Sequence, residues 1–374
     1  MKSKKTPIAA VFNYGPHYRQ AIYQKMGEEL AIDFFLGDRL QTKIKPLDTE
    51  QLPGFKSWLR NHWFRGYYWQ QGILAHFFSY RTFILTGEIK NLSSWVLLLL
   101  SKLFAKRIAL WTHGWYESGG TWNKRVQQLY FRAADLIFTY SERDRSLLIA
   151  QGIKADKVHC IYNSLAYEQQ LAVRSKLSRT TIYTDYFKNN YPVLLFIGRL
   201  EPNKKIDQLL YLLDQLNKQK CHANLVLIGG GSEAAELHQL SHRLKLGSQV
   251  WFYGPSYQEQ EIGELLYNAD LCVSPGNVGL TAMHALMYGL PVASHADLRK
   301  QMPEVEAIVE GQTGFLFQAD DLADLSTKVS QWLEQFAGTA ERREEIRQRC
   351  YKQIDEKYNP KHQIKILRKA LLED

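Results

Sequence analysis

Two cations follow an apolar strand in the second half of the chain, in the segment VLLFIGRLEPNKKIDQLL. Arg199 comes directly after the strand, which ends at Gly198, and Lys204 stands just before a helix expected from about Ile206. A guanidinium and an ammonium beside a helix N-terminus can surround a diphosphate with two charges and free N–H donors. This spacing predicts a site for a doubly negative leaving group, and a solvated basic turn is the alternative.

Glycines mark a second candidate anion site, in LCVSPGNVGLTAMHALMYGLPVASH. A buried strand is followed here by an apolar helix that is expected to end before Pro291. Glycine lets the backbone approach a ligand closely, and the dipole of the helix favours an anion at its start. His284 on this helix is either a ligand contact or a packing residue. The predicted binding segment comprises Gly276, Asn277, Val278, Gly279 and Leu280.

A glycine-rich turn in LVLIGGGSEAAEL raises a competing interpretation. Gly229, Gly231 and Ala234 match G-x-G-x-x-A between a strand and a helix, which is the pattern of a dinucleotide site. The next strand, VWFYGPS, ends without the acidic residue that would hold an adenosine ribose. We therefore favour a tight turn that lines the ligand site.

The first half of the chain offers a possible sugar contact in IALWTHGWYESGG. His113 follows a strand directly, and Trp115 and Glu117 are close to it in sequence. Histidine, acid and aromatic side chains at a strand end suit hydrogen bonding and stacking against a sugar. An ordinary surface turn is the alternative. The loop VFNYGPHYRQ after the first strand, with Gly15, is a comparable candidate.

Several catalytic motifs are absent from the sequence. There is no GxxxxGK[ST] phosphate loop and no GxSxG elbow, so the sequence supports neither P-loop hydrolysis nor an esterase. No Asp-x-Asp pair occurs, and four scattered cysteines have no ligand spacing. We expect no metal, no cofactor and a reduced, cytoplasmic protein.

Short apolar runs alternate with longer helical patterns along the whole chain, which is typical of parallel sheets with crossover helices. The first half has strand candidates at 8–13, 32–36, 82–86, 108–112, 136–140 and 158–162, and the second half at 193–197, 225–228, 250–253, 271–274, 291–294 and 314–317. Two doubly wound α/β domains are therefore expected, at 1–175 with about 355–374, and at 190–350. The linker is predicted within 171–192, which is polar and has no clear period.

Positive charge is concentrated in the first half. The 374 residues carry a net charge of +9, and residues 1–170 hold 23 Lys and Arg against 13 Asp and Glu. The segment 55–81 adds ten aromatic residues, interleaved with cations. This mixture suits a membrane surface or an acceptor glycan, although core packing and single-stranded nucleic acid use the same residues. The apolar run at 95–100 is too short to span a bilayer.

Several segments together resemble a known family. IGRLEPNKK, LVLIGGG, VWFYGPS, LYNADLCVSPGNVGLTAMHALMYGLPV and VEAIVEGQTGFLF look like the donor domain of family-4 retaining glycosyltransferases. LWTHG and ADKVHCIYNSL are similar to the acceptor-side domain of that family. The resemblance implies the GT-B fold, in which two Rossmann-like domains face each other across a cleft and the C-terminal helix returns to the first domain.

The resemblance also implies residue roles. Arg199 and Lys204 match the basic pair that neutralises the donor diphosphate without a metal, and His113 matches a catalytic residue near the donor sugar. Glu306 matches an acid at the donor pocket, and the loop with Gly254 and Pro255 would lie by the nucleobase.

One departure from the family is clear. The usual pair of glutamates eight positions apart is replaced here by Gly276 and His284. The first glutamate usually contacts the donor sugar and the second the ribose, so Asn277 or backbone amides would replace one and His284 the other. We expect this departure to affect the choice of donor and, to a lesser extent, the activity.

The expected function is a retaining hexosyl transfer in bacterial surface glycan synthesis, from a UDP- or GDP-linked sugar to a polysaccharide or lipid-linked glycan. The expected location is the cytoplasm. Whether the basic first half also contacts the inner face of the membrane is left open. No nucleic acid partner is expected. The alternatives are a GT-B-shaped sugar-nucleotide epimerase and an inactive nucleotide-sugar binding protein.

Overall fold

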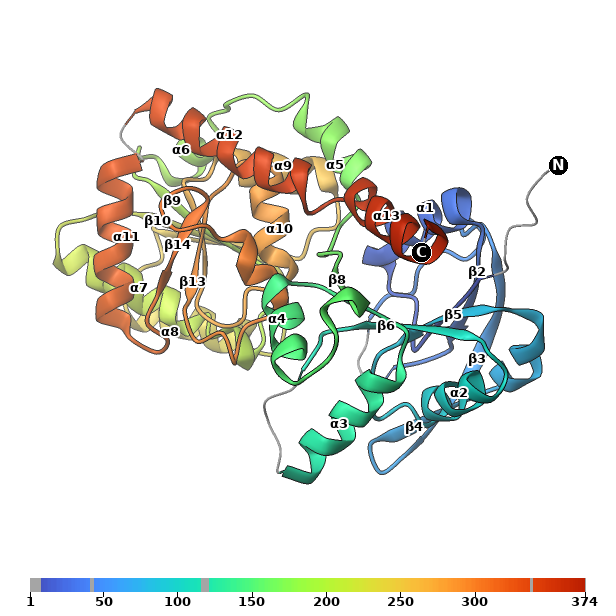
Figure 1. Ribbon diagram of the computed structural model, residues 1–374. Coiled ribbons are helices and arrows are strands. Elements are labelled where there is room, and N and C mark those ends of the chain that lie inside the picture. The colour runs from blue at the N-terminus through green and yellow to red at the C-terminus, as the bar shows by residue number, and fades with distance from the viewer. Residues whose placement is uncertain (1–7, 41–43, 116–120, 337–338, 374) are drawn as a thin grey trace. The chain divides into compact units, whose positions relative to one another are not determined.

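A computed structural model describes residues 8–40, 44–115, 121–336 and 339–373, and it divides the chain into two compact units (Figure 1). The first unit comprises Met1–Ala166 and Tyr358–Asp374, and the second comprises Tyr167–Lys357. Each unit is built around a largely parallel sheet. None of the helices in this described part is long and apolar enough to cross a membrane.

The first unit contains an eight-stranded sheet in the order β4-β3-β2-β1-β5-β6-β7-β8, and among these described strands only the β3–β4 pair is antiparallel. All six strands predicted in the first half are present. The strands are β1 (Ile8–Phe12), β2 (Ile32–Gly37), β3 (Phe55–Phe64), β4 (Tyr67–Gln71), β5 (Thr82–Thr86), β6 (Arg107–Thr112), β7 (Leu136–Thr139) and β8 (Val158–Cys160). The strand order reverses between β1 and β5, where ligands of such sheets bind.

Helices cover both faces of this sheet. They are α1 (Gln20–Leu30), α2 (Leu92–Leu103), α3 (Thr121–Ala133), α4 (Glu142–Ala150) and α13 (Pro360–Arg368). One apolar cluster joins α1 and α13 to the sheet, and the other joins α2, α3 and α4 to it. The predicted return of the C-terminal helix to the first domain is confirmed, since α13 packs beside α1 (Figure 1).

The aromatic segment 55–81 forms an edge hairpin, which the sequence pattern did not predict. Strands β3 and β4 are joined at Arg65 and Gly66, which both have positive φ values, 47° and 83°. Along β3 the side chains alternate between exposed and more buried positions. Leu59 and Tyr68 belong to the buried side, whereas Phe64 is exposed. The segment is therefore partly core and partly surface.

The second unit contains a six-stranded parallel sheet in the order β11-β10-β9-β12-β13-β14. All six predicted strands are again present: β9 (Val193–Ile197), β10 (Asn224–Ile228), β11 (Val250–Gly254), β12 (Leu271–Ser274), β13 (Val292–His295) and β14 (Gly314–Phe317). The order reverses between β9 and β12. The two predicted anion-binding segments follow these two strands, so they lie at the position where a doubly wound sheet binds its ligand.

The predicted linker at 171–192 was wrong, because this segment belongs to the second unit. It contains the end of α5 (Tyr167–Arg174) and all of α6 (Ile182–Phe187). Tyr183 and Phe187 are buried, and the Tyr183 hydroxyl donates to the carbonyl of Leu265 at 2.7 Å. The remaining helices of this unit are α7 (Asp207–Lys218), α8 (Ala234–Arg243), α9 (Glu259–Asn268), α10 (Leu280–Met287), α11 (Leu322–Phe336) and α12 (Ala340–Glu356).

Candidate functional site

Two loops meet at the strand-order reversal of the second unit. One follows β9, where Gly198 has a φ of 154° and Arg199 is exposed, and the other follows β12. The amide of Gly276 donates to the carbonyl of Lys204 at 3.0 Å. A Cβ atom on Gly276 would lie 2.1 Å from the carbonyl oxygen of Asn203, so only glycine allows the two loops to approach this closely.

Lys204 ends the short helical turn η4 (Pro202–Lys204), and its ammonium is fixed across the loop contact. Its Nζ atom donates to both the carbonyl and the side-chain oxygen of Asn277, each at 2.6 Å. Burial lowers the pKa of Lys204 and nearby Arg199 lowers it further, to about 8, although Glu304 acts in the opposite direction. The structure thus brings the predicted cationic pair together and adds Asn277 as its anchor.

The first turn of α10 starts at this same edge. Gly279 precedes the helix with φ 50° and ψ −145°, and no side chain caps it. The Val278 amide donates to Oε1 of Gln301 at 2.9 Å, and the Thr281 hydroxyl donates to the carbonyl of Ile197 at 2.8 Å. These bonds fix Leu280, the first residue of α10, beside β9. The first amides of a helix have no partner within the helix, so they are available to an anion.

The glycine-rich turn after β10 packs backbone against backbone. A Cβ atom on Gly229 would lie 1.8 Å from the carbonyl oxygen of Gly198, and one on Gly231 would lie 2.2 Å from that of Leu200. The Gly229 amide also donates to the carbonyl of Gly254 at 2.9 Å, and the ring of Pro255 lies beside this turn. The glycines therefore allow the loops after β9, β10 and β11 to pack together, which agrees with the interpretation of this segment as a tight turn.

His284 contacts a carboxylate from another helix. Its Nε2 atom lies 2.8 Å from Oε1 of Glu259 on α9, which also accepts from the Tyr288 hydroxyl at 2.7 Å and from Gln170 at 3.0 Å. Burial alone would raise the pKa of Glu259, but these hydrogen bonds outweigh it and bring the pKa to about 2. A carboxylate is therefore present beside position 284, although it comes from α9.

The acidic turn η5 (Pro303–Ala307) contains the predicted Glu306, which is half-buried. Its neighbour Glu304 is only 2% exposed and interacts electrostatically with Lys204. Sequence reasoning missed Glu304. No local sequence signal marked it, because its partner Lys204 lies far away along the chain.

The first unit has its own cavity of about 130 Å³ at the strand-order reversal between β1 and β5. Its polar lining includes Asn13, Arg19, Glu88, His113 and Tyr140. The predicted Gly15 lies in the loop that follows β1, where a Cβ atom would come within 2.7 Å of Leu47. Glu117, which was considered with His113, lies outside the described residues.

His113 and Glu88 are among the groups in this cavity whose pKa values are shifted. Burial lowers the pKa of His113 and Arg19 lowers it further, to about 4, so the imidazole is neutral at pH 7. The His113 ring packs against Tyr140 at a centroid distance of 4.6 Å. Burial raises the pKa of Glu88, which accepts from Asn13 at 3.1 Å and from the Tyr68 hydroxyl at 3.0 Å. The cavity thus presents a neutral imidazole, the Glu88 carboxyl group and the Arg19 guanidinium.

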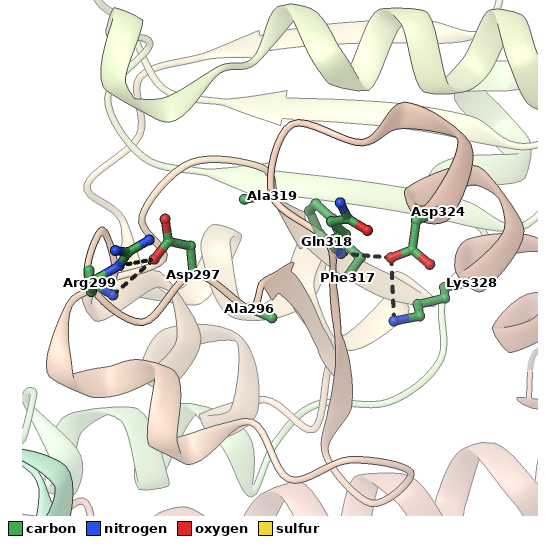
Figure 2. A pocket seen from close by; sticks show the side chains of 8 residues that line it. All are labelled: Ala296, Asp297, Arg299, Phe317, Gln318, Ala319, Asp324 and Lys328. Atoms are coloured by element: carbon green, nitrogen blue, oxygen red, sulfur yellow. Dashed lines mark hydrogen bonds and ion pairs between the residues drawn. The ribbon is translucent and has the colours of Figure 1, made fainter.

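A larger hollow of about 540 Å³ lies beyond β13 and β14 (Figure 2). The charges around it neutralise each other, since Arg299 pairs with Asp297 at 3.2 Å and Lys328 pairs with Asp324 at 3.4 Å, and Figure 2 shows these groups turned toward one another. The hollow lies away from the strand-order reversal. We therefore do not assign the ligand site to it despite its size.

Comparison with known proteins gives a family match within the second unit and relatives that match part of the chain. Residues 180–353 match the family model described as glycosyl transferases group 1. The sulfoquinovosyl transferase SQD2 of Arabidopsis thaliana is 28% identical over 203 residues, which cover 53% of this chain and 38% of that protein. Glycogen synthase 2 of Nitrosococcus oceani is 31% identical over 158 residues, covering 39% of this chain and 31% of that protein. The chain thus spans less than two fifths of the length of these relatives.

Similar solved structures cover the chain almost completely. Anabaena Alr3699/HepE in complex with UDP has a TM-score of 0.72 and 17% identity over 98% of this chain and 100% of that chain. A glycosyltransferase of Rickettsia africae has a TM-score of 0.73 and 14% identity, and the match covers 100% of both chains. At these identities the likeness is one of fold, and it confirms the predicted GT-B class.

Proposed function

We propose, because residues 180–353 match the family model described as glycosyl transferases group 1, that the protein transfers a sugar from a UDP- or GDP-linked donor to a glycan or lipid-linked acceptor. We further propose a hexosyl transfer with retained configuration that serves a bacterial surface glycan. Nucleotide sugars are cytoplasmic metabolites, so the proposed activity belongs on that side of the membrane. The observation that carries the proposal is the anchored Lys204 ammonium at the edge where β9 and β12 diverge.

The proposed chemistry requires stabilisation of a departing diphosphate. When the bond between the sugar and the phosphate breaks, negative charge accumulates on the phosphate oxygens. Lys204, Arg199 and the first amides of α10 are the groups that can receive this charge, and Asn277 keeps the ammonium in place. Loss of one such fixed charged contact costs about 2–4 kcal/mol of transition-state stabilisation. The proposed reaction assigns this role to protein groups and needs no metal.

We assign sugar contacts to the cavity of the first unit. A neutral His113 can donate one hydrogen bond and accept another, which suits a hydroxyl group. Glu88 is held by two donors and can accept from a second hydroxyl. The proposal keeps Glu306, Gly254 and Pro255 as donor-pocket residues. It adds Glu304, which acts to raise the pKa of Lys204.

The proposal is tested by donor turnover with Arg199→Ala and Lys204→Met. A panel of UDP and GDP sugars is offered with and without glycan acceptors, and each variant is expected to lower turnover by about tenfold or more. Lys352→Met on α12 is the matched control, because that side chain is 72% exposed and far along the chain from the site.

Three outcomes would contradict the proposal in different ways. Full turnover in both variants would remove the diphosphate assignment. Conversion of the donor into a stereoisomer without an acceptor would indicate an epimerase. Binding of the donor with no consumption of it would indicate an inactive nucleotide-sugar binding protein.

A further inference from the structure

Helix α2 carries apolar side chains on its exposed side as well as on its buried side. Leu97, 1% exposed, and Leu98, 2% exposed, face the interior. Ser93, Ser94 and Ser101 are each 1% exposed and face the interior, where Ser94 contacts the Tyr130 hydroxyl at 2.8 Å. The opposite side carries Leu99, 66% exposed, and Leu103, 72% exposed. A helix on a water-exposed surface normally turns its apolar stripe inward. The exposed leucines of α2 therefore form apolar surface beyond what the packing of this helix in its own unit requires.

The exposed stripe on α2 is continuous along the helix. Leu92, Val96, Leu99 and Leu103 are spaced by four, three and four residues, so they lie along one face. Phe104 extends the stripe beyond the helix end, where its ring meets the ring of Phe78 at a centroid distance of 5.2 Å. Both of these phenylalanines are exposed.

Helix α3 contacts α2 and carries exposed apolar side chains of its own (Figure 1). Trp95 on α2 packs against Tyr130 on α3 at a centroid distance of 4.8 Å. The exposed side of α3 carries Trp122 and Leu129. We call the following residues the α2–α3 surface: Phe78, Leu92, Val96, Leu99, Leu103, Phe104, Trp122 and Leu129.

The segments that form this surface are rich in cations. Residues 81–132 hold eight Lys and Arg against two Asp and Glu. Arg81, Lys90, Lys124, Arg125 and Arg132 are all exposed, and α3 has no acidic residue. An exposed apolar stripe in a basic part of the chain complements anionic lipid headgroups above an acyl layer. Docking of a second copy of the chain through the same surface would instead bring like charges together.

We propose that the α2–α3 surface docks on an anionic phospholipid bilayer, with the leucine stripe at the boundary between headgroups and acyl chains. This docking deepens the proposed function, because it would bring the enzyme to an acceptor that is linked to a lipid. The serines inside α2 need no such partner, since their hydrogen bonds are made within the unit.

The test is flotation of the full chain with vesicles, comparing the wild type with Leu99→Asp/Leu103→Asp. Wild type is expected to float with vesicles of phosphatidylglycerol and phosphatidylcholine and to bind less as salt rises. The double variant should bind about tenfold or more weakly, because two charges replace the exposed leucines. Leu372→Asp is the matched control, since Leu372 is an exposed leucine of the same unit outside the α2–α3 surface, and its binding should equal that of wild type.

The remaining outcomes also decide the question. No flotation of wild type at low salt, or equal flotation of wild type and double variant, would overturn the proposal. A wild-type dimer that the double variant abolishes, without any vesicle binding, would assign the surface to a second copy. UDP affinity is measured in parallel without vesicles. Unchanged affinity in the double variant separates failed docking from a failed donor site.

Discussion

At the scale of single residues, Lys204 combines a lowered pKa with a fixed position. Its pKa of about 8 means that the ammonium is mostly protonated at pH 7 and mostly neutral at pH 9. If only the protonated form grips the diphosphate, UDP affinity should fall by about tenfold between these two pH values. Calorimetric titration with UDP at several pH values in this range measures how the affinity changes with pH.

Replacement by arginine provides the control for this pH dependence. A guanidinium stays protonated throughout the range, so Lys204→Arg should bind UDP with a nearly flat pH profile, whatever its absolute affinity. A profile as steep as that of wild type would show that another group causes the dependence. In that case Lys204 would not be the group that binds the diphosphate through its charge.

Residue-level predictions from the sequence were drawn from local motifs, and their anion-binding role stays a prediction. Arg199, Lys204 and the 276–280 segment were predicted as anion-binding, and the structure places both segments at one strand-order reversal. Glu304 and Glu259 were missed, because each meets its partner across a long stretch of sequence. Glu304 is 100 positions from Lys204, and Glu259 is 25 positions from His284. No local pattern encodes such contacts.

At the scale of elements, the close approach of η4 and the loop after β12 positions the cations. Gly276→Ala would place a methyl group 2.1 Å from the carbonyl of Asn203 and 2.6 Å from Cα of Lys204, so one loop must move. UDP affinity is expected to fall by about tenfold or more, since misplacing a charge-stabilising group weakens its contact.

Gly247→Ala is the control for this loop contact, because a Cβ atom there would have nothing within 4 Å. Its UDP affinity and unfolding midpoint should match those of wild type. Wild-type UDP affinity in Gly276→Ala would show that the contact between the two loops does not position the ammonium. Circular dichroism confirms that both variants are folded.

The elements themselves were largely predictable, with two informative exceptions. Strands buried on both faces are continuous apolar runs, so all twelve predicted strands are found. The β3–β4 hairpin was missed because its partly exposed side chains mix aromatic and charged residues. The six-residue helix α6 was mistaken for linker because its packing depends on two aromatic anchors, Tyr183 and Phe187, rather than on an extended helical period.

At the scale of the whole molecule, the chain leaves the first unit at Ala166 and returns to it at Tyr358. The returning α13 contributes Ile364 and Leu367 to the same apolar cluster as Met26 of α1. Arg368 also pairs with Glu29 of α1 at 2.7 Å. The first unit therefore completes its core only after the second unit has been synthesised. We therefore expect a destabilising substitution in α13 to lower the stability of the first unit.

Leu367→Ala tests that dependence. Leu367 is 0% exposed, so its truncation leaves a cavity in the first core and should cost about 2–5 kcal/mol of that unit's unfolding free energy. Hydrogen exchange read by mass spectrometry should show lost protection in β1, α1 and α13, with little change in the second unit. UDP affinity should persist, because the anchored Lys204 belongs to the second unit. Leu372→Ala, at an exposed position, should change neither quantity. Equal loss of protection in both units would instead mean that the chain unfolds as one cooperative body.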